Sequence, residues 1–148
     1  MEHPLLTIRR TMGRLYMLHM EPVMTRFALT RMELDVLLFL GNNPEYDTAA
    51  EIVQLRDLTK SHVSKAVEHL TEMGLMTKTQ DTSNRRRIHL ALTDEAADAL
   101  KAGQEAQQRF VEVLTKGLSA PERKAMRRVL DAMVSNARRA LDASSEES

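Results

Sequence analysis

The sequence predicts a mainly α-helical fold with one small β-hairpin. Three segments begin with Ser or Thr followed three residues later by Glu, an arrangement in which side chains and backbone amides cap a helix N-terminus reciprocally; they start at Thr30, Thr48 and Ser119. Residues 75–92 run from apolar residues through a polar turn into an alternating stretch, which is typical of a hairpin. Long stretches near both ends of the chain have apolar residues at 3.6-residue spacing, which predicts helices with one buried face.

The middle of the chain, residues 30–92, is predicted to hold three helices and the hairpin. The box at Thr30 predicts a helix to about Gly41, and the box at Thr48 predicts a short helix to about Leu55. A turn then leads to a helix capped by Thr59, whose apolar residues recur at helical spacing: Val63, Val67, Leu70 and Met73. The order helix, short helix, turn, helix, hairpin predicts one compact unit.

The terminal helices have apolar faces that one compact unit cannot bury. One helix is expected from Leu5 to Met24, another from Thr93, and the last from the box at Ser119. We expect them to pack on each other and on a second copy, as in a helical bundle divided between subunits of a homodimer. The predicted division is therefore an N-terminal dimerisation helix (1–29), a middle unit (30–92), C-terminal dimerisation helices (93–143) and a disordered acidic tail (144–148).

Composition excludes several classes of protein. The 148 residues contain no cysteine, so disulfides, thiolate metal sites and thiol redox switches are absent. The longest apolar run, Val36 to Leu40, is far shorter than the roughly 20 residues that cross a membrane, and residues 1–10 lack the apolar core of a signal peptide. We therefore expect a cytoplasmic protein with no membrane contact.

The charge of the chain is balanced overall but uneven along its length. There are 21 basic and 21 acidic side chains, which by itself argues against a nucleic-acid partner. However, residues 33–55 contain five acids and no Lys or Arg, whereas residues 56–87 contain seven bases and four acids. The positive charge is therefore local to the segment that holds the third helix and the hairpin.

The third helix of the middle unit has a polar face suited to DNA. Opposite its apolar stripe lie short or cationic side chains concentrated toward its N-terminus: Lys60, Ser61, His62, Ser64, Lys65 and His69. The major groove of B-DNA admits one helix, and such side chains contact base edges and phosphates there. The pattern predicts a recognition helix that binds double-stranded DNA.

The run LTKSHVSKAVEHLTEMGLM (residues 58–76), followed by DTSNRRRIHLALT (residues 81–93), resembles the recognition helix and wing of MarR-type (multiple antibiotic resistance regulator) transcription factors. The family wing reads Asp-Pro-x-Asp-Arg-Arg, then a strand ending Leu-x-Leu-Thr. The chain matches this pattern at six positions: Asp81, Arg85, Arg86, Leu90, Leu92 and Thr93. It departs at Thr82, where Pro is usual, and at Asn84, where Asp is usual. The flanking helices match the family's dimerisation elements in order and length.

This resemblance implies a winged helix-turn-helix fold and a dimer bound to a pseudo-palindromic operator. The recognition helix would lie in the major groove, and the wing arginines, Arg85, Arg86 and Arg87, would reach a minor groove whose negative potential attracts them. Asp81 would stabilise the wing by pairing with Arg86 or Arg85. The resemblance also implies a repressor, because the family usually acts by occluding a promoter.

An effector site is expected, on the same resemblance, between the first helix and the DNA-binding lobe. An apolar wall with one or two polar tips suits a small aromatic or phenolic ligand, and the side chains selected are Tyr16, His19, Met20 and Phe27. Packing in the core is the competing interpretation of these residues.

Other functions are weighed against this interpretation. The five histidines lack metal-ligand spacing, so we expect no metal site and no cofactor. No phosphate loop, nucleophile elbow or paired carboxylates indicate an enzyme. Two alternatives stay open at this point: a winged-helix module that binds protein, and a small-molecule-binding protein with no operator.

Overall fold

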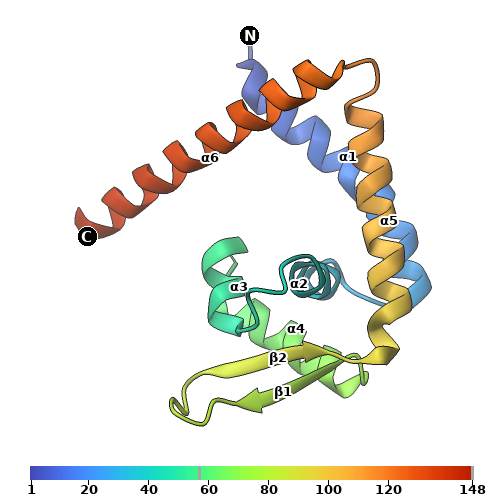
Figure 1. Cartoon of the computed structure of the whole chain (residues 1–148), viewed down its shortest axis with the longest axis vertical. Helices are drawn as coiled ribbons and strands as arrows, with labels where there is room; N and C mark the ends of the chain where they lie inside the picture. Colours follow the sequence, from blue (N-terminus) through green and yellow to red (C-terminus); the bar gives the residue numbers. More distant parts are fainter. Residues whose placement is uncertain (57, 148) are drawn as a thin grey trace. The chain divides into compact units, whose positions relative to one another are not determined.

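The computed structural model describes residues 1–56 and 58–147. Two compact units are distinguished, residues 1–110 and 111–148, and each is described by itself. In chain order the elements are α1 (Pro4–Phe27), α2 (Arg31–Asn42), α3 (Ala49–Arg56), α4 (Lys60–Glu72), β1 (Met76–Gln80), β2 (Ile88–Leu92), the short 3₁₀ helix η1 (Asp94–Ala96), α5 (Ala97–Leu114) and α6 (Ala120–Glu147) (Figure 1). The boundary between the units falls within α5.

The predicted fold class is confirmed: within the described residues the structure is mostly helical, with one two-stranded antiparallel sheet. The strands pair in register from Met76 opposite Leu92 to Gln80 opposite Ile88. The sheet is also joined to the segment before α3, because the amide of Leu90 donates to the carbonyl of Asp47 over 2.6 Å. This contact fixes the hairpin against the helices instead of leaving it as an isolated ribbon, which would be marginally stable.

The three predicted capping boxes are present. In α2 the amide of Thr30 donates to Oε1 of Glu33 over 2.9 Å, and the amide of Glu33 donates back to Oγ1 of Thr30 over 3.1 Å. The same reciprocal bonds join Thr48 with Glu51 and Ser119 with Glu122. Each box satisfies backbone donors that a helix N-terminus otherwise leaves unpaired, which is why these helices begin where the sequence predicts.

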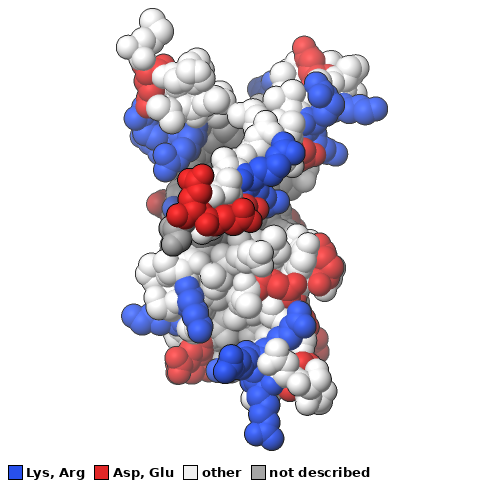
Figure 2. Space-filling view, turned by 90° about the vertical axis from the view of Figure 1, so that its left-hand side faces the viewer, with Lys and Arg blue, Asp and Glu red and all other residues white. Residues whose placement is uncertain are grey.

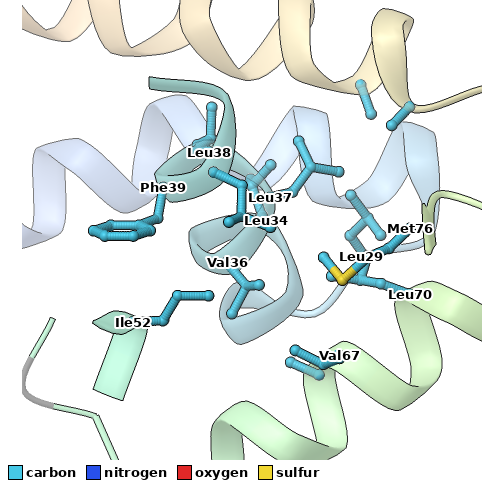
Figure 3. Packing of buried hydrophobic residues seen from close by; sticks show 14 of the residues in the cluster. Leu29, Leu34, Val36, Leu37, Leu38, Phe39, Ile52, Val67, Leu70 and Met76 are labelled. Carbon is cyan, nitrogen blue, oxygen red and sulfur yellow. The ribbon is translucent and has the colours of Figure 1, made fainter. Parts of the chain in front are cut away.

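The core of the first unit is built around α2. Figure 3 shows its side chains pointing outward to several partners, and Val36 and Leu37 are fully buried. The partners that close the core are Ile52 from α3, Val67 and Leu70 from α4, and Met76 from β1. Burial of each such side chain contributes about 1.5–3 kcal/mol, so α2 fixes the position of the helix-turn-helix relative to the hairpin.

Two glycines allow α2 and the first part of α5 to cross closely. A Cβ atom on Gly103 would lie 2.8 Å from Cδ2 of Leu38, and a Cβ atom on Gly41 would lie 2.2 Å from Cδ1 of Leu100. Neither position has room for a larger residue without movement of its neighbour. The close crossing of α2 and α5 therefore depends on the lack of side chains at Gly41 and Gly103.

In the second unit, α6 extends further than the sequence predicts. The helix continues to Glu147, whereas the sequence predicts disorder from residue 144; Ser148 lies outside the described residues. The hydroxyls of Ser144 and Ser145 donate to the carbonyls of Ala140 and Leu141, each over 3.1 Å. These bonds pair both serine hydroxyls with backbone carbonyls of the preceding turn, and this arrangement is compatible with a helix.

Along α6 the large apolar side chains are exposed: Met126, Val129, Leu130, Met133, Val134 and Leu141. Their spacing follows the helical period, so they form one apolar stripe. Among the described residues, no helix is both long enough and apolar enough to cross a lipid bilayer.

Candidate nucleic-acid interface

Helix α4 buries one face and exposes the other. Its N-cap Thr59 accepts a 3.3 Å hydrogen bond from the amide of His62. Val63, Val67 and Leu70 are buried. The six side chains that the sequence selects for DNA all lie at exposed positions: Lys60, Ser61, His62, Ser64, Lys65 and His69. Because the buried positions recur at helical spacing, these residues are presented together on the opposite side of α4.

The three wing arginines lie at the tip of the hairpin. Arg85, Arg86 and Arg87 are all exposed, and Figure 2 shows blue side chains gathered at the lower end of the molecule, where Figure 1 places the hairpin tip. The turn is held by backbone contacts on either side of them. The amide of Asp81 donates to the carbonyl of Arg87 over 2.9 Å, and the Gln80 side chain donates to the carbonyl of Arg85 over 2.7 Å.

The expected pairing of Asp81 with a wing arginine is wrong. Within the described residues, neither Arg85 nor Arg86 forms an ion pair with Asp81. Oδ2 of Asp81 instead accepts hydrogen bonds of 3.0 Å from the hydroxyl of Ser83 and the amide of Asn84. The physical reason is proximity, because an Asp side chain readily bonds to backbone a few residues ahead in a turn. The guanidinium groups are left without this carboxylate as a partner.

Asn84, where the family pattern has Asp, also supports the turn. Its Oδ1 accepts a 3.1 Å hydrogen bond from the amide of Arg86. An Asp at this position would supply the same kind of acceptor, so the departure preserves the local contact while removing one negative charge beside the arginines.

His89 connects the wing to the helices, and sequence reasoning did not select it. Its Nδ1 lies 2.9 Å from Oδ2 of Asp47, and its Nε2 lies 3.2 Å from Oδ1 of Asp81. A neutral imidazole has one N–H and can donate to only one carboxylate, whereas the imidazolium donates to both. The hydrogen bonds to Asp47 and Asp81 accordingly raise the pKa of His89, and the contact with His89 is the main cause that lowers the pKa of Asp81.

His69 is tied to α2. Its Nδ1 contacts Oε2 of Glu33. Glu33 is buried, with 4% of its surface exposed. Burial of Glu33 opposes ionisation, but hydrogen bonds from the Thr30 amide and from His69 outweigh it, so the pKa of Glu33 is lowered. The contact with Glu33 raises the pKa of His69. This ion pair joins the polar side of α4 to the capped end of α2.

A groove of about 480 Å³ lies alongside this ion pair. It is lined by the N-terminal end of α2 and by the polar side of α4, with the residues Thr30, Met32, Glu33, His62, Lys65, Ala66 and His69. Two side chains predicted to contact DNA, His62 and Lys65, therefore border a hollow. The described residues contain no group of three or more side chains able to hold a metal ion.

The four residues predicted for an effector site differ in their surroundings. Met20 is 2% exposed and belongs to the core, and Phe27 packs against that core. The Tyr16 ring meets Phe110 edge-on at 5.2 Å between centroids, and the His19 ring lies 6.4 Å from Phe110. The Tyr16 hydroxyl accepts a 3.1 Å hydrogen bond from Gln107. Tyr16 and His19 thus share a neighbour on α5, and the effector site stays a prediction.

The comparisons with known proteins bear on the same segment. The model of the MarR family matches residues 29–87, from the end of α1 to the wing arginines. This segment is similar to the MarR family. No curated protein matches the chain.

Solved structures match the chain along most of its length and show the same fold. A crystal structure of MarR has 21% identity and a TM-score of 0.76, with 94% of each chain covered. A MepR–DNA complex from S. aureus has 20% identity and a TM-score of 0.75, covering 91% of this chain and 99% of that one. BpsR from Bordetella bronchiseptica has 17% identity and a TM-score of 0.70, with coverages of 89% and 99%. The MarR-type winged-helix fold predicted from the sequence is thereby confirmed.

Proposed function

We propose that this chain is a DNA-binding transcriptional regulator, and not an enzyme, that acts in the cytoplasm as a homodimer on a pseudo-palindromic operator. The observation that carries the proposal is the arrangement of residues 29–87: an exposed polar face on α4 beside a hairpin with three exposed arginines, within the segment that matches the MarR family. The MepR structure of the same fold is a complex with DNA, which supports the choice of ligand.

Helix and wing have different roles in this proposal. Ser61, His62 and Lys65, near the N-terminus of α4, contact base edges and phosphates in the major groove, and Lys60, Ser64 and His69 add contacts along the same side. The wing arginines, Arg85, Arg86 and Arg87, enter the adjacent minor groove, where negative potential is concentrated. Asp81 acts indirectly, because it holds the turn that presents them.

The homodimer is supported by apolar surface on the terminal elements. In the first unit Leu5, Leu6 and Ile8 of α1 are about half exposed, and in the second unit α6 exposes its apolar stripe. Exposed apolar surface of this extent marks interaction sites in soluble proteins. A second copy would cover it and would place two recognition helices about 34 Å apart, one turn of DNA.

The regulator is proposed to be a repressor that a small aromatic or phenolic ligand releases from DNA. BpsR, which shares the fold, has its DNA binding regulated by 6-hydroxynicotinic acid, a small aromatic acid. Tyr16 and His19 supply the polar tips of the proposed site, beside the ring of Phe110. A ligand bound there releases DNA only as far as it binds the DNA-free form more tightly.

Fluorescence anisotropy with genomic fragments selected on the immobilised protein tests the DNA-binding proposal. Lys65→Ala should weaken binding about tenfold, and Arg86→Ala should weaken it while flattening the preference for A·T-rich flanks. Lys101→Ala, an exposed change on α5, is the matched control and should leave affinity unchanged. Equal affinity for wild type, Lys65→Ala and Arg86→Ala contradicts the proposal.

Effector release is tested by adding phenolic acids at millimolar concentration to the complex with DNA. Wild type should release DNA, and Tyr16→Phe, which keeps the ring against Phe110 but lacks the hydroxyl, should need more ligand. If no compound shifts DNA affinity, Tyr16 and His19 belong to the packing of α1 on α5 and the effector proposal is wrong.

A further inference from the structure

The groove between α2 and α4 has one wall that carries a lysine and two histidines. His62, Lys65 and His69 line it and follow one another along α4 at spacings of three and four residues, so they form one row on the same side of the helix. All three lie at exposed positions. The other wall is the capped N-terminal end of α2. A phosphate entering the groove would therefore meet cationic or titratable side chains along the whole of one wall.

Glu33 is the one acid among the described residues that line this groove. The amide of Thr30 donates to its Oε1 over 2.9 Å, which leaves Oε2 for His69. The Glu33 side chain is 5% exposed, whereas the His69 side chain is 50% exposed. The capping box thus holds a buried carboxylate behind a half-exposed imidazole.

This contact decides the hydrogen-bonding role of each ring nitrogen of His69. A carboxylate only accepts, so Nδ1 carries a hydrogen and donates it to Glu33 whether or not the ring is charged. Within the part of the chain that the structure describes, Nε2 forms no hydrogen bond. It is a donor in the imidazolium and an acceptor in the neutral ring. Loss of the proton therefore replaces a donor to an anion with an acceptor.

The charge beside the groove changes in the same direction. An imidazolium balances the Glu33 carboxylate, whereas a neutral ring leaves that buried negative charge uncompensated. Glu33 is the main cause that raises the pKa of His69, and Glu72 of α4 adds to it. The other charged or titratable groups that line the groove are His62 and Lys65. Deprotonation of His69 thus opposes an anion in the groove twice, through the lost donor and through the exposed charge of Glu33.

We propose that Glu33 is a positioning residue for DNA binding, because it holds the His69 imidazolium with Nε2–H free to donate to a backbone phosphate in this groove. The proposal rests on the DNA binding of the proposed function and adds a role for a side chain that does not touch DNA. A phosphate is the expected partner, since His69 lies in the last turn of α4 and recognition helices contact base edges mainly with their N-terminal residues. DNA affinity then falls as pH rises through the titration of His69.

The pH profile of DNA affinity tests the proposal, measured by fluorescence anisotropy from pH 5 to 9 with the selected genomic fragments. Wild-type affinity should fall about tenfold as a charge-assisted hydrogen bond is lost, with a midpoint above the ordinary histidine value of about 6.5. Glu33→Gln keeps an acceptor for the Thr30 amide, so its midpoint should be lower than that of the wild type. His69→Gln should lack this transition.

Glu51→Gln is the matched control. It makes the same change in the capping box of α3, where the carboxylate bonds to Thr48, and it should keep the wild-type midpoint. His62 and His89 are present in every variant, so the differences between profiles decide the outcome.

NMR titration of the His69 ring provides a second measurement. If DNA prefers the charged ring, DNA must raise the pKa of His69 further, because coupling between proton and DNA is reciprocal. The ring should therefore titrate at higher pH in the complex than in the free protein. An equal pKa in both states means that no phosphate binds the ring.

The outcomes separate the failure of this contact from the failure of DNA binding. A wild-type chain that binds no DNA at any pH overturns both. DNA binding with one common midpoint in wild type, Glu33→Gln and Glu51→Gln overturns the positioning role alone, as does an equal shift in the two glutamine variants. His69→Gln changes a half-exposed side chain and decides the case if Glu33→Gln does not fold: a wild-type profile overturns the proposal, and so does an altered base preference without loss of the transition.

Discussion

Nε2 of His89 lies 3.2 Å from Oδ1 of Asp81, across the base of the hairpin turn. The opposite nitrogen of the same ring faces Asp47, in the segment that pairs with β2 just before α3. One imidazolium therefore joins the turn that presents the arginines to the helix-turn-helix. Protonation of His89 therefore strengthens one link between the wing and the helices, beside the backbone bond from Leu90 to Asp47.

Stability should depend on pH through His89. Its pKa is raised in the folded protein, so its contribution is fully present below the unfolded value, about 6.5, and is lost as pH rises through the folded pKa. The pKa of Asp81 is lowered, so its contribution is present above about 3.9 and is lost as pH falls further. The His89–Asp81 contact is strongest between these limits.

Urea unfolding measured from pH 5 to 9 checks this dependence. His89→Gln should remove the part of the decline that, in the wild type, begins as pH rises above the unfolded value of about 6.5. His62→Gln, at an exposed position of α4, should leave the decline in place. Parallel profiles for wild type and His89→Gln would show that the imidazolium does not stabilise the wing.

Glu33→Gln should keep the N-terminal cap of α2 but remove the ion pair that joins α2 to α4. Glutamine can still accept a hydrogen bond from the Thr30 amide, as in other capping boxes, but it carries no charge for His69. The pKa of His69, raised by Glu33, should fall toward its ordinary value. NMR titration of the His69 ring measures the change, and the His89 ring in the same spectra, whose partners are Asp47 and Asp81, should titrate as in wild type.

Thr48→Ala should destabilise the protein by about 1–2 kcal/mol, the usual cost of losing a Thr N-cap. Thr48 is 2% exposed, its hydroxyl donates to Glu51 over 2.6 Å, and the same oxygen accepts from the amide of Glu51. Chemical denaturation gives the free energy of unfolding. Thr82→Ala, an exposed change in the wing turn, should stay within about 0.5 kcal/mol of wild type.

Salt should weaken operator binding steeply. A dimer that neutralises about six phosphates gives a slope of roughly −5 when the logarithm of affinity is plotted against that of salt concentration. Replacing Arg85 or Arg86 with Ala should make the slope less steep by about one unit for each phosphate that the dimer no longer neutralises. An affinity insensitive to salt would mean that the basic face of α4 and the wing tip do not contact the DNA backbone.

Local patterns in the sequence were sufficient for most of the fold. The capping boxes at Thr30, Thr48 and Ser119 act over three residues, so their residue types alone locate the helix starts. The apolar stripe of α4 predicted its buried face, since burial follows the helical period. The alternation before Thr93 likewise predicted the hairpin.

Contacts between residues far apart in the sequence could not be predicted from local sequence patterns. His89 meets Asp47 across 42 positions and His69 meets Glu33 across 36, and nothing in either local segment indicates the partner. Asp81 was assigned to the wing but given the wrong partner, because the turn geometry that brings Ser83 and Asn84 to its carboxylate is not evident from charge alone. The residues chosen for an effector site share an amphipathic helix, and that pattern does not distinguish Met20 in the core from Tyr16 at its edge.

The close crossing of α2 and α5 gives the first unit a stiff mechanical connection. At Gly103 and Gly41 the two helices meet with no compressible layer between them, and packed interiors transmit displacement instead of absorbing it. Any force that translates the first half of α5 must therefore move α2. Because Val36 of α2 is buried with Val67 and Leu70 of α4 in one core, the displacement reaches the recognition helix. In the proposed dimer on DNA, a displacement of α5 would therefore alter the spacing of the two α4 helices without any ligand touching α4.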